Sequence, residues 1–399
     1  MSINAYLRAD GRKGIRNTVV VGYLVECAHH VSREIVHPFR QQGAHLIGFP
    51  GCFPNPYSHK MMERLCTHPN VGAVLLVSLG CEGFNKGKLL ETVRKSGRPT
   101  KLVVIQESGG TRKSIEEGQA WVEQTLKQLE NTPRAPMGLD ELIVGTICGG
   151  SDATSGLTAN PAMGRAFDFL VEQNATCIFE ETGELIGMEH WMAKRAENPE
   201  LGEEIVRTVA KAAKYYAAYG HASIGPGNAD GGLTTIEEKS LGAYAKSGQS
   251  AISGIIKPGD VPICGGLYLL DVVPDGEPRF GFPNISDNAE IAELMACGSH
   301  LTLFSTGRGS VVGSAISPVI KVCANPDTYR RMSEDMDVDA GRILEGKATL
   351  DDVGREIYDL ILRVANGERT RSEALGHQEF ILTYKSFEPL GPACFPSAA

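Results

Sequence analysis

The 399-residue sequence has no apolar run long enough to cross a membrane and no excess of basic residues. A transmembrane helix needs about 20 consecutive apolar residues, and no stretch of the chain approaches that length. The formal net charge is -9, whereas nucleic-acid-binding proteins usually carry a basic excess. Residues 1–17 carry charges but no apolar core, so they do not resemble a signal peptide. We therefore expect a cytoplasmic protein that binds neither nucleic acid nor a membrane.

Paired cysteines and nucleotide-binding signatures are also missing. None of the ten cysteines forms a CxxC pair, and the glycine-rich stretch 145–156 lacks both the P-loop lysine and the GxGxxG spacing. In a reducing compartment such scattered cysteines are thiols that serve packing, metal binding or catalysis. Glycine, by contrast, is abundant at 46 residues, which is typical of chains with tight turns and ligand-binding loops.

Short apolar runs alternate with segments of helical spacing through the first third of the chain. The expected strands are 18–27, 44–52, 73–81 and 101–110. The helices expected to follow them are, in the same order, 30–43, 58–68, 86–97 and 115–131. This rhythm, with fully apolar strands, predicts a parallel sheet covered by helices on both faces. The pattern breaks at 131–141 and resumes afterwards, with a long helical stretch at 189–218 and further helices at 327–372. We predict an α/β protein with two Rossmann-like domains and mainly parallel sheets, divided into residues 1–135 and 136–399.

Cysteines stand where four predicted strands end: Cys27, Cys52, Cys81 and Cys148, with Cys264 placed similarly in a later run. Parallel α/β sheets bind ligands at the carboxyl ends of their strands. Thiolates bind iron and zinc and hold iron–sulfur clusters, but cysteine is also a small apolar residue that is often buried at strand ends. The spacing matches no compact ligand motif, so both interpretations stay open.

The stretch 145–156 follows the apolar run ELIV and combines Cys148 with glycines and hydroxyls. Ser151 or Asp152 could cap a following helix. A glycine-rich loop before a helix is also an anion site, because free backbone N–H groups and the helix dipole favour a carboxylate.

Three later segments carry polar groups suited to catalysis. Segment 179–191 gathers four glutamates with His190, a combination that can move protons or ligate a metal, or can simply form a solvated helix start. Segment 225–242 carries Asn228 and Lys239, where a lysine can act as a base if it is desolvated; the alternative is an exposed turn with a helix cap. Segment 304–313 places Arg308 between glycines, where its planar fork can hold an anionic substrate.

Blocks along nearly the whole chain resemble the altronate and galactarate dehydratase family. They are YLRADGRKGIRN, HPNVGAVLLVSLGCEG, CGGSDATSGLTANPAMG, EETGELIGMEH, GNADGGLTTIEEKSLGAYAKSG and FSTGRGSVVGSAISPVIKV, in the order of the family. The resemblance implies a lyase that removes water from a sugar acid, an aldonate or aldarate, and gives a 2-keto-3-deoxy acid. It also implies Fe²⁺ or an iron–sulfur cluster, with Mn²⁺ as a substitute.

The chain begins directly at the first of these blocks, whereas full-length members carry a small β-rich SAF domain before it. The resemblance therefore implies the large subunit of a split enzyme, with a small SAF-domain subunit as partner, and we expect a homo-oligomer. Split members include sulfolactate sulfo-lyases, which release sulfite. A sulfo-lyase large subunit is thus the alternative within the family, a non-catalytic scaffold subunit is another, and a nucleotide-binding module is disfavoured by the missing fingerprint.

Elimination from a sugar acid needs a base, an acid or metal, and groups that hold the substrate carboxylate. We assign the base to Lys239 or His190, with Glu181 or Glu184 as partner. The expected substrate-binding groups are Arg308, Gly149, Gly150, Ser151, Asp152, Asn228 and Thr306. The expected metal ligands are Cys52, Cys81, Cys148 and Glu82, with Asp152 as a further candidate.

Overall fold

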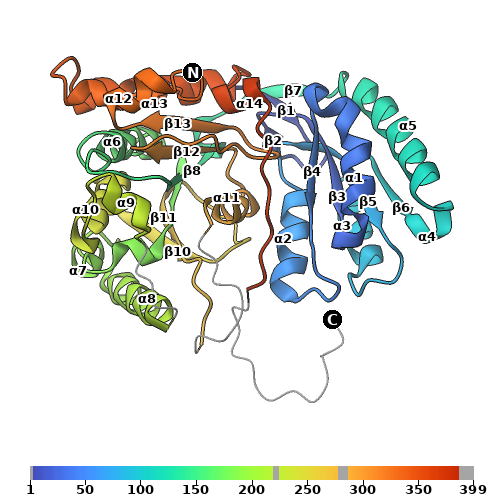
Figure 1. Ribbon diagram of the computed structural model, residues 1–399, viewed down its shortest axis with the longest axis horizontal. Helices are drawn as coiled ribbons and strands as arrows, with labels where there is room; N and C mark the ends of the chain where they lie inside the picture. The colour runs from blue at the N-terminus through green and yellow to red at the C-terminus, as the bar shows by residue number, and fades with distance from the viewer. Residues whose placement is uncertain (1–2, 219–223, 277–285, 386–399) are drawn as a thin grey trace.

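The computed structural model describes residues 3–218, 224–276 and 286–385, which form two α/β units joined by a small antiparallel sheet (Figure 1). In that sheet β1 (Ile3–Leu7) pairs with β2 (Lys13–Gly14) and with β7 (Arg134–Met137). The start of the chain is therefore tied to the junction between the units. Strand β7 crosses the boundary predicted after residue 135, and the two-domain division stays a prediction.

The N-terminal unit is a four-stranded parallel sheet in the order β4-β3-β5-β6. Its strands are β3 (Thr18–Tyr23), β4 (Ala44–Gly48), β5 (Val71–Ser78) and β6 (Thr100–Val104). Every residue of β5 is buried, as expected for an inner strand covered on both faces.

Helices cover both faces of this sheet because successive strand side chains alternate between them. Val19 and Val21 of β3 pack in one core with α1 (His29–Val36) and α5 (Thr111–Leu129). Val20 packs in another with α2 (Pro56–Cys66) and α3 (Lys86–Lys95), while the short α4 (Ile105–Ser108) follows β6. Gly43 follows the last helical turn before β4 with a φ of 98°, a left-handed conformation that glycine adopts readily at a helix end.

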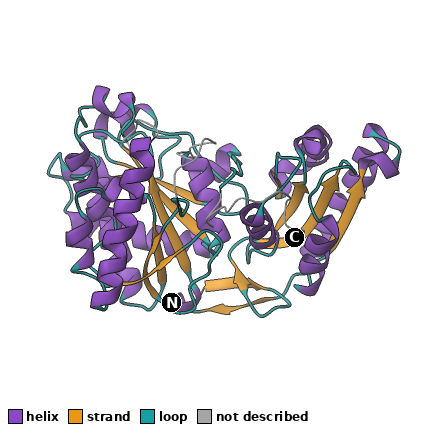
Figure 2. Cartoon of the chain, turned by 90° about the horizontal axis from the view of Figure 1, so that it is seen from below, coloured by secondary structure: helices purple, strands orange, loops and turns teal. Residues whose placement is uncertain are grey.

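The second unit is built on a seven-stranded, fully parallel sheet in the order β10-β11-β9-β8-β12-β13-β14. Its strands are β8 (Ile143–Cys148), β9 (Thr176–Phe179), β10 (Ile252–Ile256), β11 (Gly266–Leu270), β12 (Leu301–Thr306), β13 (Val319–Cys323) and β14 (Val338–Asp339). The helices of this unit surround the sheet in Figure 2. They are α6 (Ala159–Val171), α7 (Glu189–Ala193), α8 (Pro199–Ala218), α9 (Pro226–Asp230), α10 (Ile236–Lys246), α11 (Asp287–Ala296), α12 (Pro326–Arg331), α13 (Leu350–Ala365) and α14 (Arg371–Leu375).

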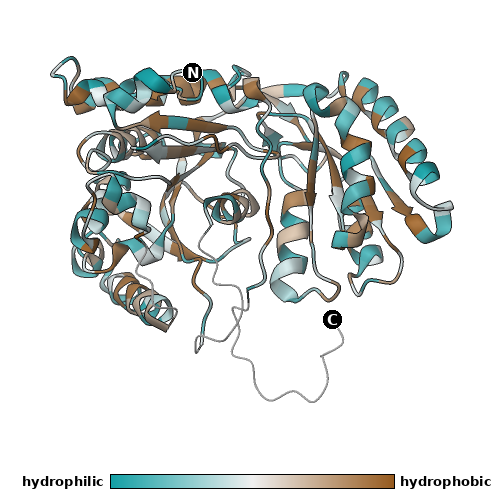
Figure 3. Ribbon diagram, viewed as in Figure 1, coloured by the Kyte–Doolittle hydropathy of each residue, from teal (hydrophilic) through white to brown (hydrophobic). Residues whose placement is uncertain are grey.

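The two units share one apolar core. Met61 and Met62 of α2 and Leu294 and Met295 of α11 belong to the same buried cluster, and all four are at most 1 % exposed. In Figure 3 the strands of both units are mainly hydrophobic, whereas many residues of the outer helices are hydrophilic. Because one core spans the seam, the two units are held together by apolar packing as well as by the β1–β7 pairing.

The predicted α/β class with mainly parallel sheets is confirmed. Three local predictions are wrong. Cys264 precedes β11 and so stands at the amino end of a strand, the stretch 189–218 is broken into α7 and α8, and Ser151 and Asp152 cap no helix, since α6 begins only at Ala159. The segment 277–285 lies outside the described residues.

Candidate functional site

The site forms at the carboxyl end of β8, the middle strand of the larger sheet. The chain continues from β8 to β9 on one side of it, and β12 lies on the other side, so the strand order reverses at this point. Ligands of open α/β sheets bind in the crevice at such a reversal. The loops after β8 and β12 meet there, because the carbonyl of Gly150 accepts hydrogen bonds from the N–H groups of Gly307 (3.1 Å) and Arg308 (2.8 Å).

The thiol of Cys148, the last residue of β8, is surrounded by charged side chains. Its Sγ lies 3.2 Å from Oε1 of Glu181, 3.3 Å from Oε2 of Glu184 and 3.3 Å from Nζ of Lys239. The hydroxyl of Ser151 donates to the same sulfur over 3.5 Å. All five residues are buried. Cys148, Glu181 and Glu184 each offer a ligand atom within 4.8 Å of the others, so these three residues can hold a metal ion.

Glu181 owes its position to a strained backbone at the end of β9. Its φ is 75°, in the left-handed region that non-glycine residues rarely adopt. Its Oε2 accepts a hydrogen bond from the N–H of Cys148 (3.1 Å) and forms an ion pair with Lys246. Strain of this kind persists where surrounding contacts hold it and is concentrated at functional sites. Here the backbone of Cys148 and the ammonium of Lys246 hold the carboxylate beside the thiol.

Helix α10 supplies both cations of the site. Lys239 and Lys246 are seven residues apart, which is two helical turns, so their side chains leave the same face. Lys239 forms an ion pair with Glu184 (2.7 Å) and donates to Ser151 Oγ (3.0 Å). Burial lowers the pKa of Lys239, but Cys148 and Glu184 raise this pKa by more, so it lies well above the usual value. Lys239 is therefore an ammonium here, not a free base.

Lys246 was missed from the sequence, although its spacing from Lys239 is a signal that could have found it. A second missed residue is Asp287, at the start of α11. A Cβ placed on Gly149 would fall 2.0 Å from Oδ2 of Asp287, so only glycine lets this carboxylate approach the loop after β8. Burial, followed by the charge of Glu184, raises the pKa of Asp287.

The loop after β8 is held by Asn228 and Asp152, two residues that we expected to bind substrate. Asn228 donates to the carbonyl of Ser151 (2.9 Å), and Asp152 accepts hydrogen bonds from the N–H of Thr154 and from Asn325, both over 2.9 Å. The N–H of Gly149 donates a hydrogen bond to the carbonyl of Ser305 (3.0 Å). The N–H groups of Gly150 and Ser151 make no hydrogen bond within the described chain, so they remain available to an anion.

Residues at the end of β12 complete this side of the site. Thr306, the last residue of that strand, is buried and donates to the carbonyl of Gly150 over 3.4 Å. Arg308 follows in the loop, donates to the carbonyl of Gly227 and lies 4.0 Å from a carboxylate oxygen of Asp230. Its side chain is 44 % exposed, which leaves much of the guanidinium open to solvent.

Four predicted site residues do not join this group. His190 is exposed on α7 and makes no hydrogen bond or ion pair with it among the described residues. Cys52 and Cys81 are exposed loop residues that follow β4 and β5 of the other sheet. Glu82 follows Cys81, and its carboxylate is occupied by Ser78 and by the N–H of Gly80 (2.8 Å). The strands end before the predicted positions, because β4 stops at Gly48 and β5 at Ser78. Both cysteines also belong to a different sheet from Cys148, so the described residues do not bring the three thiols to one centre.

No helix among the described residues is long and apolar enough to cross a membrane.

Comparison with known proteins identifies the relatives of this chain. Residues 5–130 match the family model for the D-galactarate dehydratase/altronate hydrolase second domain, and residues 139–387 match that for the D-galactarate/altronate dehydratase C-terminal region. The chain is 33% identical over 396 residues to the (2R)-sulfolactate sulfo-lyase subunit beta of Chromohalobacter salexigens, covering 95% of this chain and 96% of that protein.

Dehydratases are similar as well. The altronate dehydratase of Escherichia coli is 29% identical over 95% of this chain and 77% of its own length. The galactarate dehydratase (L-threo-forming) of the same organism is 33% identical over 78% of this chain and 59% of its own length. The resemblance inferred from the sequence blocks is thus confirmed, and the chain belongs to the D-galactarate/altronate dehydratase family.

Proposed function

We propose that this protein is a lyase that eliminates water from a sugar acid, an aldonate or aldarate, to give a 2-keto-3-deoxy acid. The observation that carries the proposal is the buried group of Cys148, Glu181, Glu184 and Lys239 at the strand-order reversal of a chain of this family. The relatives are named as dehydratases and as a subunit of a sulfo-lyase, so lyase activity is common to them.

A divalent iron fits the donor set. Cys148 offers a thiolate and Glu181 and Glu184 offer carboxylates, a mixed sulfur and oxygen set that suits a borderline metal ion such as Fe²⁺, with Mn²⁺ as a substitute. An iron–sulfur cluster needs several thiolates, and the described residues bring no second cysteine to this group. We therefore favour a single ion over the cluster. When bound, such an ion would act as a Lewis acid on the substrate oxygens.

The chain's own residues have separate tasks in this scheme. The unbonded N–H groups of Gly150 and Ser151, together with Arg308, receive the substrate carboxylate. The Lys239 ammonium faces the buried centre and stabilises the negative charge that develops when the α-proton leaves. For Lys239 itself to take that proton, it must first pass its own proton to Glu184, 2.7 Å away. His190 lies outside the group and is no longer our candidate for the base.

The test begins with anaerobic purification and analysis of bound metal and sulfide. Iron without acid-labile sulfide is the expected result. Cys148→Ala should lose both the iron and the activity on the responsive sugar acid, while Cys264→Ala, which changes an exposed thiol outside the group, should keep both. Normal iron content and full activity in Cys148→Ala would refute the metal-site assignment. Exchange of the α-proton in deuterated water tests the base, and undiminished exchange in Lys239→Ala would exclude this lysine.

A sulfolactate sulfo-lyase subunit is the second candidate. It is favoured by a 33% identity that spans 96% of the beta subunit of the Chromohalobacter enzyme. That relative's designation as a subunit also supports a partner chain for this protein, which we propose to be a small SAF-domain subunit. Sulfite release from sulfolactate, measured beside keto-acid release from a sugar-acid panel, with and without the small chain, separates the two functions. If neither sulfite nor a keto acid is released under any of these conditions, the protein is a non-catalytic scaffold subunit.

A further inference from the structure

A cavity of about 330 Å³ lies at the seam between the two units, away from the Cys148 group. Its lining includes Thr18, where β3 begins, Gly43, directly before β4, and Ser317, just before β13. These are the amino ends of parallel strands, whereas Cys148 stands at the carboxyl end of β8. The strands β8, β12 and β13 run in the same direction. The cavity therefore opens at the opposite edge of the sheet from the proposed catalytic site and is not part of it.

Positive charge dominates the lining. Four arginines contribute to it, against one carboxylate, that of Glu373. Arg16 neutralises this carboxylate with a bidentate ion pair, through Nε (2.6 Å) and a terminal nitrogen (2.8 Å). The remaining three are Arg40, Arg134 and Arg369, and none of them forms an ion pair within the described residues. The cavity thus gathers three guanidinium groups without carboxylate partners.

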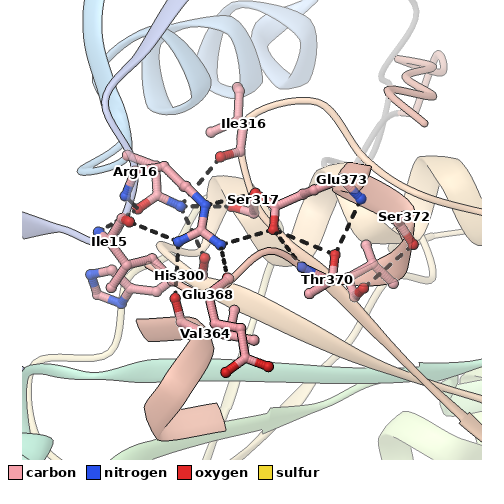
Figure 4. Close-up of polar contacts among 12 residues, drawn as sticks. Ile15, Arg16, His300, Ile316, Ser317, Val364, Glu368, Thr370, Ser372 and Glu373 are labelled. Carbon is pink, nitrogen blue, oxygen red and sulfur yellow. Dashed lines mark hydrogen bonds and ion pairs between the residues drawn. The ribbon is translucent and has the colours of Figure 1, made fainter. Parts of the chain in front are cut away.

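The pair of Arg16 and Glu373 builds the frame of this cavity (Figure 4). Arg16 also donates to the carbonyls of Ile15 and Val364, both over 2.9 Å, and of Glu368 over 2.8 Å. Figure 4 shows its guanidinium between these groups, so residues more than 340 positions apart are fixed to one side chain. Because Arg16 is fully engaged, it shapes the site while the other arginines stay open.

Two of the open arginines are already oriented by neutral contacts. Arg134 stacks on the ring of Tyr6 at 4.1 Å and donates to the Tyr6 hydroxyl over 2.6 Å, while Arg40 donates to the carbonyl of Gly376. Arg369 makes no hydrogen bond within the described residues. These contacts position the guanidinium groups without cancelling their charge, as in sites for bidentate anion recognition.

A neutral histidine adds a donor. Nδ1 of His45 accepts a hydrogen bond from the N–H of Ile316 (2.9 Å), so the ring proton is on Nε2, which makes no hydrogen bond within the described chain. His45 lines the cavity, as do Gly43 and Gly367, and a Cβ on either glycine would meet nothing within 4 Å. The backbone here leaves open space beside the arginines.

We propose that this seam cavity binds a small organic polyanion, with two or more carboxylate or phosphate groups, through Arg40, Arg134 and Arg369. The volume lies at the lower end of the range for metabolite pockets, roughly 300–1,000 Å³, which suits a compact metabolite. Arg40 belongs to the N-terminal unit and Arg369 to the C-terminal one, so a bound anion links the two units. Such a ligand stabilises the assembled chain by mass action and makes this a regulatory site distinct from the substrate site.

The proposal is tested by calorimetric titration of the whole chain with citrate and with pyrophosphate at constant ionic strength. We expect one saturable site. Tighter binding of citrate would indicate a carboxylate ligand, and tighter binding of pyrophosphate would indicate a phosphate ligand. Arg369→Ala and Arg40→Ala should each weaken binding about tenfold or more, since each removes charge-assisted hydrogen bonds. Both residues are exposed, so the variants should fold, and circular dichroism checks this.

Two controls separate this site from the alternatives. Arg112→Ala removes an exposed arginine of α5 outside the cavity and should leave the affinity unchanged. Arg308→Ala alters the proposed substrate site and should also leave it unchanged, so the result does not depend on the proposed function. Absence of saturable binding of citrate and pyrophosphate would overturn the proposal. It would also be overturned if Arg112→Ala weakened binding as much as the cavity variants do, or if only Arg308→Ala lost binding.

Discussion

Lowering the pH should loosen the seam between the two units through His300, which sits between them. Nε2 of His300 donates to the carbonyl of Lys13 (3.0 Å), and its Nδ1 accepts from the N–H of Ile143 (3.0 Å). The side chain is 3 % exposed, and burial lowers its pKa to about 4. A second ring proton would have to displace the Ile143 hydrogen bond, because both nitrogens are already used.

The size of the effect follows from linkage. The folded-state pKa of His300 is about 4, below the usual value of 6.5, so between these pH values the unfolded chain binds a proton that the folded chain does not. The stability from the neutral ring is fully present above pH 6.5 and is lost as the pH falls toward 4. Integrating this difference gives a loss of about 2.5 kcal/mol at pH 4.5 relative to pH 7.5.

Urea unfolding of wild type and His300→Gln at pH 7.5 and 4.5 measures this loss. Glutamine does not titrate in this range, so the drop in unfolding free energy between the two pH values should be smaller in the variant by about 2.5 kcal/mol. His45, whose pKa burial also lowers to about 4, titrates in both proteins and cancels in the comparison. An equal drop in both proteins would show that His300 is not the group that senses pH.

Three further outcomes are expected. Lys246→Met leaves its partner carboxylate buried without a cation and should lower the free energy of unfolding by about 3–5 kcal/mol; an unchanged urea midpoint would contradict the pairing. Gly149→Ala brings a Cβ to 2.0 Å from Asp287 and should lower the melting temperature by several degrees, whereas Gly87→Ala, where the nearest atom is 3.7 Å away, should not. Stripping metal with a chelator should lower the melting temperature of wild type but not of Cys148→Ala, and identical shifts would place the metal elsewhere.

Periodicity was a good guide to the N-terminal unit because its strands are short, fully apolar and separated by amphipathic helices. The antiparallel sheet escaped detection for a physical reason. Its strands β1 and β7 are more than 120 residues apart, and β2 has only two residues, so no local pattern marks their pairing. The break between α7 and α8 was hidden because polar residues continue through it, although Pro199 begins the second helix.

The site was predicted in part. Cys148, the pair Glu181 and Glu184, and Lys239 were chosen from three separate blocks, and the structure brings all four residues together. What sequence could not show is which sheet each strand joins, and so Cys52 was grouped with a thiol that belongs to another sheet. The left-handed backbone of Glu181 was equally invisible, since glutamate does not favour that conformation and only tertiary contacts impose it.

The apolar core shared by α2 and α11 bears on how this protein can be dissected. The family models divide it at about residues 131–138, which suggests two pieces that could be produced separately. Each fragment would then carry a bare apolar face, with Met61 and Met62 on one and Leu294 and Met295 on the other. Exposed patches of this kind drive aggregation. Fragments cut at this junction should therefore be soluble only when they are co-expressed, and fragment complementation rather than independent folding is the behaviour to look for.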